Sequence, residues 1–233
     1  MPLASAIAEK VREVRALMTL ACERAHRAPE SVHLLAVSKT FDAEAVAAAH
    51  AAGLASFGEN YVQEGVAKVL ALANPGLEWH FIGPIQSNKT RPIAEHFAWV
   101  HSIDRLKIAE RLSAQRPRHL PDLQVCLQVN ISGETSKSGI ESAAIADLAV
   151  AVAALPRLRL RGLMTVPQPA ALVEEQRAPF RELRLLLAQL NARGLGCDTL
   201  SMGMSADLEA AILEGATIVR VGTAIFGIRT KIT

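Results

Sequence analysis

The sequence predicts an α/β fold in which eight parallel strands close into a (β/α)8 barrel, the TIM barrel, with an extra N-terminal helix. Two observations indicate it. Eight short apolar runs alternate with longer helical segments, and the residues with reactive or ligand-binding side chains follow directly after the runs. An open doubly wound sheet is the alternative, but it normally has a glycine-rich turn after its first strand, where this chain has Ser38-Lys39-Thr40.

The first predicted element is an amphipathic helix from residue 3 to about residue 27, because Ile7, Val11, Val14 and Met18 recur at intervals of three and four residues. The predicted strands then cover residues 33–38, 55–58, 78–82, 98–102, 123–130, 158–164, 199–202 and 218–221. The predicted helices between them cover residues 42–52, 61–73, 104–114, 141–155, 172–192 and 206–214. No low-complexity stretch or long polar linker divides the chain, so we expect one domain over residues 1–233.

Composition excludes several classes of protein. The chain has 25 basic and 23 acidic residues and a net charge of +2, which is not the footprint of a nucleic-acid binder or an anionic-membrane binder. No uncharged apolar run approaches the ~18 residues of a membrane span, and charged residues near the start argue against a signal peptide. Cys22, Cys126 and Cys197 form neither a CxxC pair nor a disulfide framework, which favours a reducing, cytoplasmic setting.

Lys39 follows the first predicted strand, whose residues Leu34 to Val37 are apolar enough to be buried on both faces. In a parallel barrel, function collects at the carboxyl ends of the strands. A lysine held partly out of water loses part of its preference for the charged form, and its neutral amine can condense with an aldehyde. Lys39 is therefore a candidate nucleophile, with a solvated lysine as the alternative, and Lys89 and Lys137 are predicted on the same face.

The loops after the last two predicted strands are typical of a phosphate site. Ser205 stands where the N-cap of the next helix is expected, Gly203 permits close backbone approach, and Gly222 with Thr223 adds a second glycine and a hydroxyl donor. The alternative is that Ser205 only caps a helix and Gly222 only turns the chain. Arg220 is expected to point into the barrel, where a buried arginine needs an acceptor such as a ring nitrogen or a carboxylate.

The remaining motifs are weak. The seven histidines show no HExxH motif and no paired ligand spacing, so the sequence gives metal catalysis no support. His80, within a predicted strand, is interpreted as a core histidine with satisfied hydrogen bonds. The segment 132–139 is interpreted as a surface loop, with a mobile lid as the alternative.

Six short motifs together resemble the pyridoxal 5′-phosphate homeostasis protein family, the YggS/PROSC group. They are VSKT at residues 37–40, FGENY at 57–61, HFIG at 80–83, LMT at 163–165, SMGMSAD at 201–207 and RVGTAIFG at 220–227. The resemblance runs in order from about Leu34 to Gly227, and the combination is specific although each motif alone is not.

The resemblance implies a barrel similar to the N-terminal domain of alanine racemase, with pyridoxal phosphate (PLP) as cofactor. It implies a Schiff base on Lys39. The other cofactor-binding residues that it implies are Asn60 beside the cofactor, Ser201 and Met202 lining the pocket, Arg220 facing the pyridine nitrogen, and Ser205, Gly222 and Thr223 at the phosphate. Members of the family are regarded as carriers or regulators of the cofactor, acting on vitamin B6 balance without an established catalytic activity.

Three functions follow from these observations. The first is a PLP-binding homeostasis protein, a monomer without catalysis, that stores a reactive aldehyde or hands it over to PLP-dependent apo-enzymes. The second is a PLP-dependent racemase. It is disfavoured because an arginine beside the ring nitrogen makes a weak electron sink and because Tyr61 is the only tyrosine available as an opposite base. The third is a barrel that binds another phosphorylated metabolite, with Lys39 paired to its phosphate.

Overall fold

A computed structural model describes residues 3–132 and 138–227, and in it eight parallel strands pair in sequence order and close into one barrel. Closure comes from the pairing of the first strand with the last, where Leu35 lies opposite Arg220 and Ala36 opposite Val221. The predicted (β/α)8 barrel is therefore confirmed, and the open doubly wound sheet is wrong, because an open sheet would leave these two strands at its edges.

The strands are short and mostly buried. They are β1 (His33–Val37), β2 (Ser56–Glu59), β3 (Glu78–Phe81), β4 (Trp99–Ile103), β5 (Leu123–Gln128), β6 (Leu158–Met164), β7 (Thr199–Ser201) and β8 (Ile218–Val221). All of them lie within the predicted ranges or differ by one or two residues at an end, because apolar runs with flanking turn residues set strand limits well.

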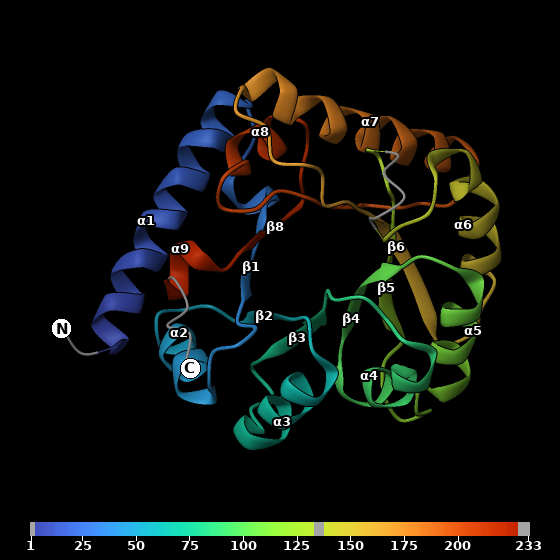
Figure 1. The fold of residues 1–233 in the computed structure, drawn as a ribbon, viewed down its shortest axis with the longest axis horizontal. Helices are drawn as coiled ribbons and strands as arrows, with labels where there is room; N and C mark the ends of the chain where they lie inside the picture. The colour runs from blue at the N-terminus through green and yellow to red at the C-terminus, as the bar shows by residue number, and fades with distance from the viewer. Residues whose placement is uncertain (1–2, 133–137, 228–233) are drawn as a thin grey trace.

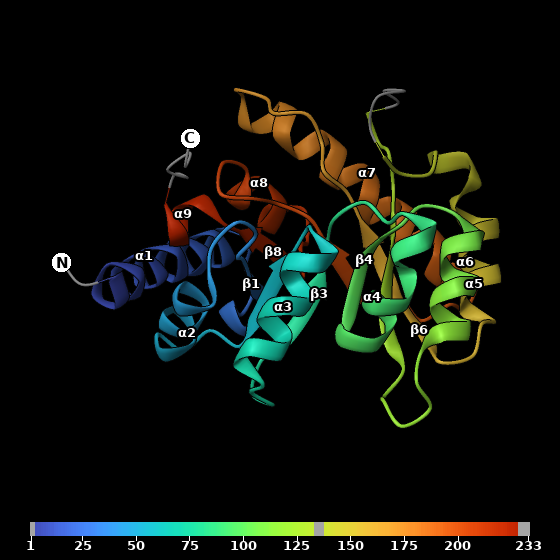
Figure 2. The same ribbon diagram turned by 60° about the horizontal axis from the view of Figure 1, so that its bottom comes forward.

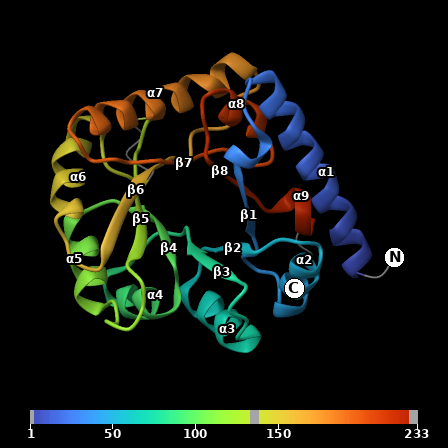
Figure 3. The same ribbon diagram turned by 180° about the vertical axis from the view of Figure 1, so that it is seen from behind.

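Helices surround the strands on every side, as Figures 1 and 3 show from opposite directions. They are α1 (Leu3–Arg24), α2 (Ala43–Ala51), α3 (Val62–Leu72), α4 (Thr90–His96), α5 (Leu106–Gln115), α6 (Ile145–Ala153), α7 (Val173–Ala192), α8 (Leu208–Leu213) and α9 (Thr223–Phe226). None of the helices within residues 3–132 and 138–227 is long and apolar enough to cross a membrane.

The extra helix α1 precedes the eight strand–helix units and lies against α2, α8 and α9, as Figure 2 shows from the side. It buries one stripe of residues, which is made by Ile7, Val11, Val14, Met18 and their neighbours. This is the face expected from the three- and four-residue spacing.

Two helices were not expected from the sequence. The α4 helix has only seven residues with Pro92 inside its first turn, and α9 has only four, so neither gives a periodic pattern long enough to recognise. The α8 helix was expected from residue 206 but begins at Leu208.

The inside of the barrel is unusually polar. A small apolar cluster of Leu35, Trp99, Cys126, Met164 and Ile218 forms one part of it. The side chains of His80, His101, Ser201 and Arg220 are also buried and bond to one another, and the bond between His101 of β4 and Ser201 of β7 joins strands that are not neighbours in the sheet. Barrel interiors are usually filled by Val, Ile and Leu, so this polar row marks a functional interior.

We predict that Gly162 is required for pairing of β6 with β7. A Cβ atom added there would lie 1.9 Å from the carbonyl oxygen of Thr199, whereas one added at Gly194 would have no atom within 4 Å. Gly162→Ala should lower the free energy of unfolding by about 3 kcal/mol or more, because backbone must move to admit the methyl group. Gly194 also has a positive φ, of +85°, so the control Gly194→Ala should cost only about 1 to 2 kcal/mol. Urea unfolding measures both, and equal losses would contradict the prediction.

Candidate functional site

The predicted site residues come from strands that end at one face of the barrel. Lys39 lies two residues beyond β1, Asn60 directly follows β2, Ser201 ends β7, and Arg220 is in β8. The β1 strand pairs with both β2 and β8, which brings the first two residues and the last one to adjoining parts of the rim. Gly222 allows the loop after β8 to pass close to the end of β1, because a Cβ atom there would lie 3.1 Å from the carbonyl oxygen of Val37.

The turn that carries Lys39 is held from both sides by ionic groups. On one side, the Ser38 hydroxyl donates to Oε1 of buried Glu59 (2.6 Å), and Lys68 Nζ donates to the Ser38 carbonyl (2.7 Å) and to Glu59 (2.7 Å). On the other side, Glu64 accepts the backbone N–H of Thr40 and pairs with Lys68 at 2.7 Å. Thr40 itself has a φ of 68°, which is unusual for threonine.

These contacts fix the position of Lys39, whose side chain is partly buried. The anchoring groups are Ser38, Glu59, Glu64 and Lys68, and sequence reasoning missed their roles. Glu59 belongs to the FGENY motif, and Lys68 follows nine residues later on the buried face of α3. The spacing of four residues between Glu64 and Lys68 on a predicted helix is the signal that could have indicated part of this network.

Arg220 forms the opposite part of the site. Its Nη1 donates to the carbonyl oxygen (2.5 Å) and hydroxyl oxygen (2.9 Å) of Ser201, and its Nη2 donates to the carbonyl of Thr165 (2.8 Å). Burial lowers the pKa of Arg220 to about 10, so the guanidinium remains charged at neutral pH. The expectation that Arg220 points into the barrel is confirmed, and its acceptors here are backbone and hydroxyl oxygens of β7 and of the residue after β6.

A histidine that the sequence did not single out contacts this pair. His101 is fully buried, and its Nδ1 lies 2.7 Å from the Ser201 hydroxyl. Burial first, then the nearby His80 and Arg220, hold the pKa of His101 well below its ordinary value. His101 is therefore a neutral hydrogen-bonding group. His80 is hydrogen-bonded through both ring nitrogens, which confirms its interpretation as a satisfied core histidine.

Asn60 has an acceptor that the protein leaves unsatisfied. Its Oδ1 is buried without a hydrogen-bond partner among the described residues. Its backbone is fixed by Gly83, where a Cβ atom would lie 2.2 Å from the Asn60 carbonyl oxygen. A buried orphan acceptor is costly unless something else satisfies it, so Asn60 is suited to meet a bound polar group.

The loop after β7 differs from its predicted form. Ser205 is exposed and is not the N-cap of α8, because Asp207 takes that position and accepts the backbone N–H of Met204 (2.5 Å). A turn over residues 205–207 therefore comes before the helix. Gly203 does need to be glycine, with φ at 91° and a Cβ position 2.4 Å from the Cβ of Ala211. Met202 is fully buried, and Thr223 is exposed as the first residue of α9.

Residues 133–137 of the predicted 132–139 loop, with Lys137, lie outside the described residues. Lys89 is partly buried and ends a short 3-10 turn before α4.

The fold and this rim together define a barrel of the alanine racemase type. The model of the alanine racemase N-terminal domain family matches residues 10–230, so the chain belongs to that family. Alanine racemase from Corynebacterium glutamicum superposes with a TM-score of 0.75 at 18% identity, over 97% of this chain and 62% of the racemase chain. At that identity the likeness concerns the fold alone.

Within this class, the chain belongs with the pyridoxal phosphate homeostasis proteins. It is 63% identical to the protein of that name from Pseudomonas aeruginosa over 97% of this chain and 96% of the relative. It is 55% identical to the protein of the same name from Escherichia coli K12, over 96% of this chain and 97% of the relative. The structure of PipY from Synechococcus elongatus with PLP bound superposes with a TM-score of 0.82 at 37% identity, over 95% of this chain and all of PipY.

We predict that Lys68 neutralises Glu59 behind the Lys39 turn. The two side chains are 6% and 0% exposed, so Lys68→Met leaves a buried carboxylate unpaired and should lower the free energy of unfolding by about 3–5 kcal/mol. Lys68→Met with Glu59→Gln should lose clearly less, because no buried charge remains.

Urea unfolding measures these losses. The matched control is Arg91→Met, which removes a cation from the exposed pair with Glu95 and should show no measurable loss. Losses that simply add in the double variant would mean that Lys68 and Glu59 do not depend on each other.

Proposed function

We propose that this protein binds PLP at the carboxyl end of the barrel, covalently as a Schiff base on Lys39, and acts in PLP homeostasis as a carrier or regulator. The observation that carries the proposal is the pairing, across one rim, of a rigidly held lysine turn with a buried arginine. When bound, PLP supplies an aldehyde that condenses with amines. The name of the relatives and the PLP-bound structure of PipY support the proposal.

The residues present fit the group. Asn60 offers a buried acceptor that lacks a partner within the described chain, and Arg220 offers a fixed cation. We assign Ser205, Gly222 and Thr223 to the phosphate, Arg220 to the pyridine nitrogen, Asn60 to the side of the cofactor, and Ser201 and Met202 to the pocket wall. The glycine at residue 222 lets the backbone come close, and the exposed hydroxyls of Ser205 and Thr223 are free to turn toward an anion.

We further propose that the protein is not a racemase. Arg220 carries only donors, stays charged at neutral pH, and is held by three oxygens, so it does not hand a proton to a ring nitrogen. The ring would then be a weak electron sink. The only tyrosine, Tyr61, is 52% exposed at the start of α3 and is not held in place as a second base.

The proposed role in the cell is to store the PLP aldehyde and release it. A free aldehyde reacts indiscriminately with amines, so holding it on Lys39 protects the cell and the cofactor, and an incoming amine releases it by exchange. We assign the protein to the cytoplasm as a monomer that supplies PLP-dependent apo-enzymes. The three cysteines, all buried and unpaired in the structure, are consistent with a reducing compartment.

We predict that borohydride reduction of the yellow, PLP-loaded protein fixes a phosphopyridoxyl group on the peptide that contains Lys39. Peptide mass mapping locates the adduct. Lys39→Arg keeps the charge but cannot form the imine and should lose the adduct at least ~20-fold. Lys89→Arg, on the same predicted face, should keep it. An unmodified Lys39 would overturn the assignment. If, in addition, Lys39→Arg bound a phosphate ester without an aldehyde as well as the parent does, a binder of another phosphorylated metabolite would be favoured.

The fold likeness to alanine racemase makes racemisation the second candidate. We predict that the PLP-loaded protein exchanges the α-hydrogen of either alanine enantiomer in deuterated solvent no faster than free PLP does, because both the acid at the ring nitrogen and the second base are missing. Proton NMR follows the exchange. Fast exchange that disappears in Lys39→Arg would establish the racemase instead.

A further inference from the structure

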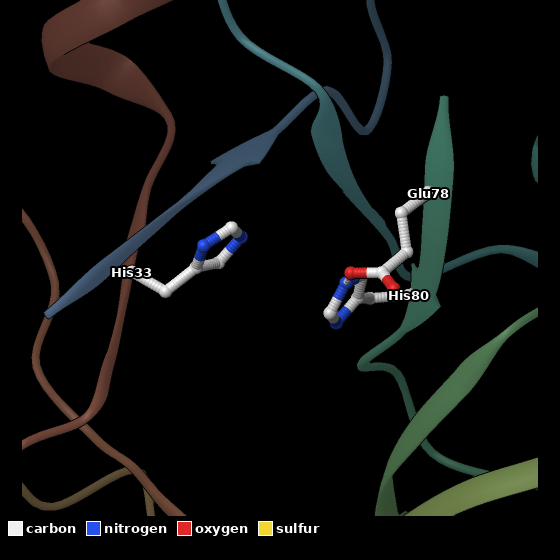
Figure 4. A group of neighbouring side chains, drawn as sticks. All are labelled: His33, Glu78 and His80. Carbon is white, nitrogen blue, oxygen red and sulfur yellow. Dashed lines mark hydrogen bonds and ion pairs between the residues drawn. The ribbon is translucent and has the colours of Figure 1, made fainter. Parts of the chain in front are cut away.

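A second cluster of ligand-type side chains lies at the amino ends of the strands, away from Lys39. His33 is the first residue of β1, Glu78 is the first residue of β3, and His80 follows on the same strand. Figure 4 shows the side chains of both strands turned toward one shared space. One ligand atom from each residue lies within 4.8 Å of the other two, although His33 and Glu78 are 45 residues apart in sequence.

We propose that His33, Glu78 and His80 form a binding site for a divalent transition metal ion of the Zn²⁺ type. Two imidazoles and one carboxylate are a set that binds Zn²⁺ and leaves a coordination position for solvent. Oε1 of Glu78 and Nε2 of His80 are already 2.9 Å apart, close to the ~3.3 Å between ligand atoms of a tetrahedral Zn²⁺ site. The ring of His33 has to approach by roughly 1 to 1.5 Å, which its exposed place at the strand end permits.

The site is open and its charge is suitable. A cavity of about 340 Å³ adjoins the three residues and is also lined by Arg161, Asp198 and Trp99. The Arg161 guanidinium is the cation in this cavity, but its Nε and Nη2 donate to Asp198 (2.9 and 2.8 Å), its Nη1 donates to Gln124, and it lies over the Trp99 ring. The carboxylate of Glu78 is therefore left to attract an incoming cation.

Hydrogen bonds behind His80 orient it as a ligand. A series of hydrogen bonds begins between Glu78 and His80 Nε2 and continues from His80 Nδ1 to His101 Nε2 (2.9 Å). It ends between His101 Nδ1 and the Ser201 hydroxyl, which also accepts from Arg220. Metal-binding histidines commonly hold their second nitrogen in this way. Each ring meets one hydrogen-bond partner at each nitrogen, and a neutral imidazole fills these places by donating at one nitrogen and accepting at the other.

The group at each end of this hydrogen-bond series determines which atom donates in each bond. The Glu78 carboxylate only accepts, so His80 donates through Nε2 and accepts at Nδ1; His101 then donates through Nε2 and accepts from Ser201. A metal ion at His80 Nε2 takes the place of that proton, which then resides on Nδ1. Each ring still holds one proton, but both links reverse: His101 donates to Ser201, and the Ser201 hydroxyl rotates so that its own proton points away from His101. The metal site would thereby act on the hydroxyl beside Arg220.

The test is titration of the full chain, freed of PLP, with Co²⁺, whose visible absorption intensifies in a tetrahedral histidine site. We expect one Co²⁺ per chain, displaced by Zn²⁺, and binding at least ~10-fold weaker in His33→Ala and Glu78→Gln. Both changes are at exposed positions, unlike His80, so folding should survive. The control His119→Ala removes an exposed histidine outside the cluster and should bind normally.

Absence of stoichiometric Co²⁺ binding, or equal binding in His33→Ala and the parent, would overturn the metal site. The effect on Ser201 rests on the proposed function and is read separately, as a Zn²⁺-dependent change in the absorption of bound PLP that is lost in His33→Ala. Co²⁺ binding without that change would retain the site and overturn only its link to Ser201. A chain that takes up no PLP would fail the proposed function while leaving the Co²⁺ result intact.

Discussion

The buried guanidinium of Arg220 is the interaction on which the rest of this molecule depends. Burying a charge costs several kcal/mol unless good acceptors surround it. Here the acceptors are the carbonyl and hydroxyl of Ser201 and the carbonyl of Thr165, so one side chain of β8 joins the ends of β7 and β6. The cation therefore stabilises the carboxyl rim of the barrel and sets the electrostatic character of whatever binds there.

A buried ion pair, Lys68 with Glu59, lies on the other side of β1. Lys68 and Glu59 neutralise each other behind the turn that holds Lys39. Lys68 also binds the backbone carbonyl of Ser38, and Glu64 binds the backbone N–H of Thr40, so the backbone is held on either side of that lysine. The β1 strand pairs with β2 and with β8, so it lies between the two ionic groups. The position of Lys39 relative to Arg220 is thus determined by backbone pairing and buried charges.

The sequence predicted the barrel and its strands because apolar runs and turn residues are local signals. It missed α4 and α9 because short helices carry little periodicity. It placed the N-cap at Ser205, whereas Asp207 takes that position and accepts the backbone N–H of Met204. The site residues were identified through the family resemblance and through their places after strands. The partners Glu59, Lys68 and His101 were not, since contacts across the barrel or between sheet and helix leave no spacing in the chain.

The same argument explains why the histidine cluster has no sequence signature. Residues at the starts of β1 and β3 meet only because the barrel curves, with β2 between them. A fully apolar interior would leave no hydrogen-bonded connection between the two ends of the barrel. Here Arg220 requires a hydroxyl acceptor, the hydroxyl is satisfied by His101, and His101 is satisfied by His80, whose second nitrogen reaches Glu78. Satisfying one buried cation has thus produced a continuous polar connection from the cofactor rim to the opposite end of the barrel.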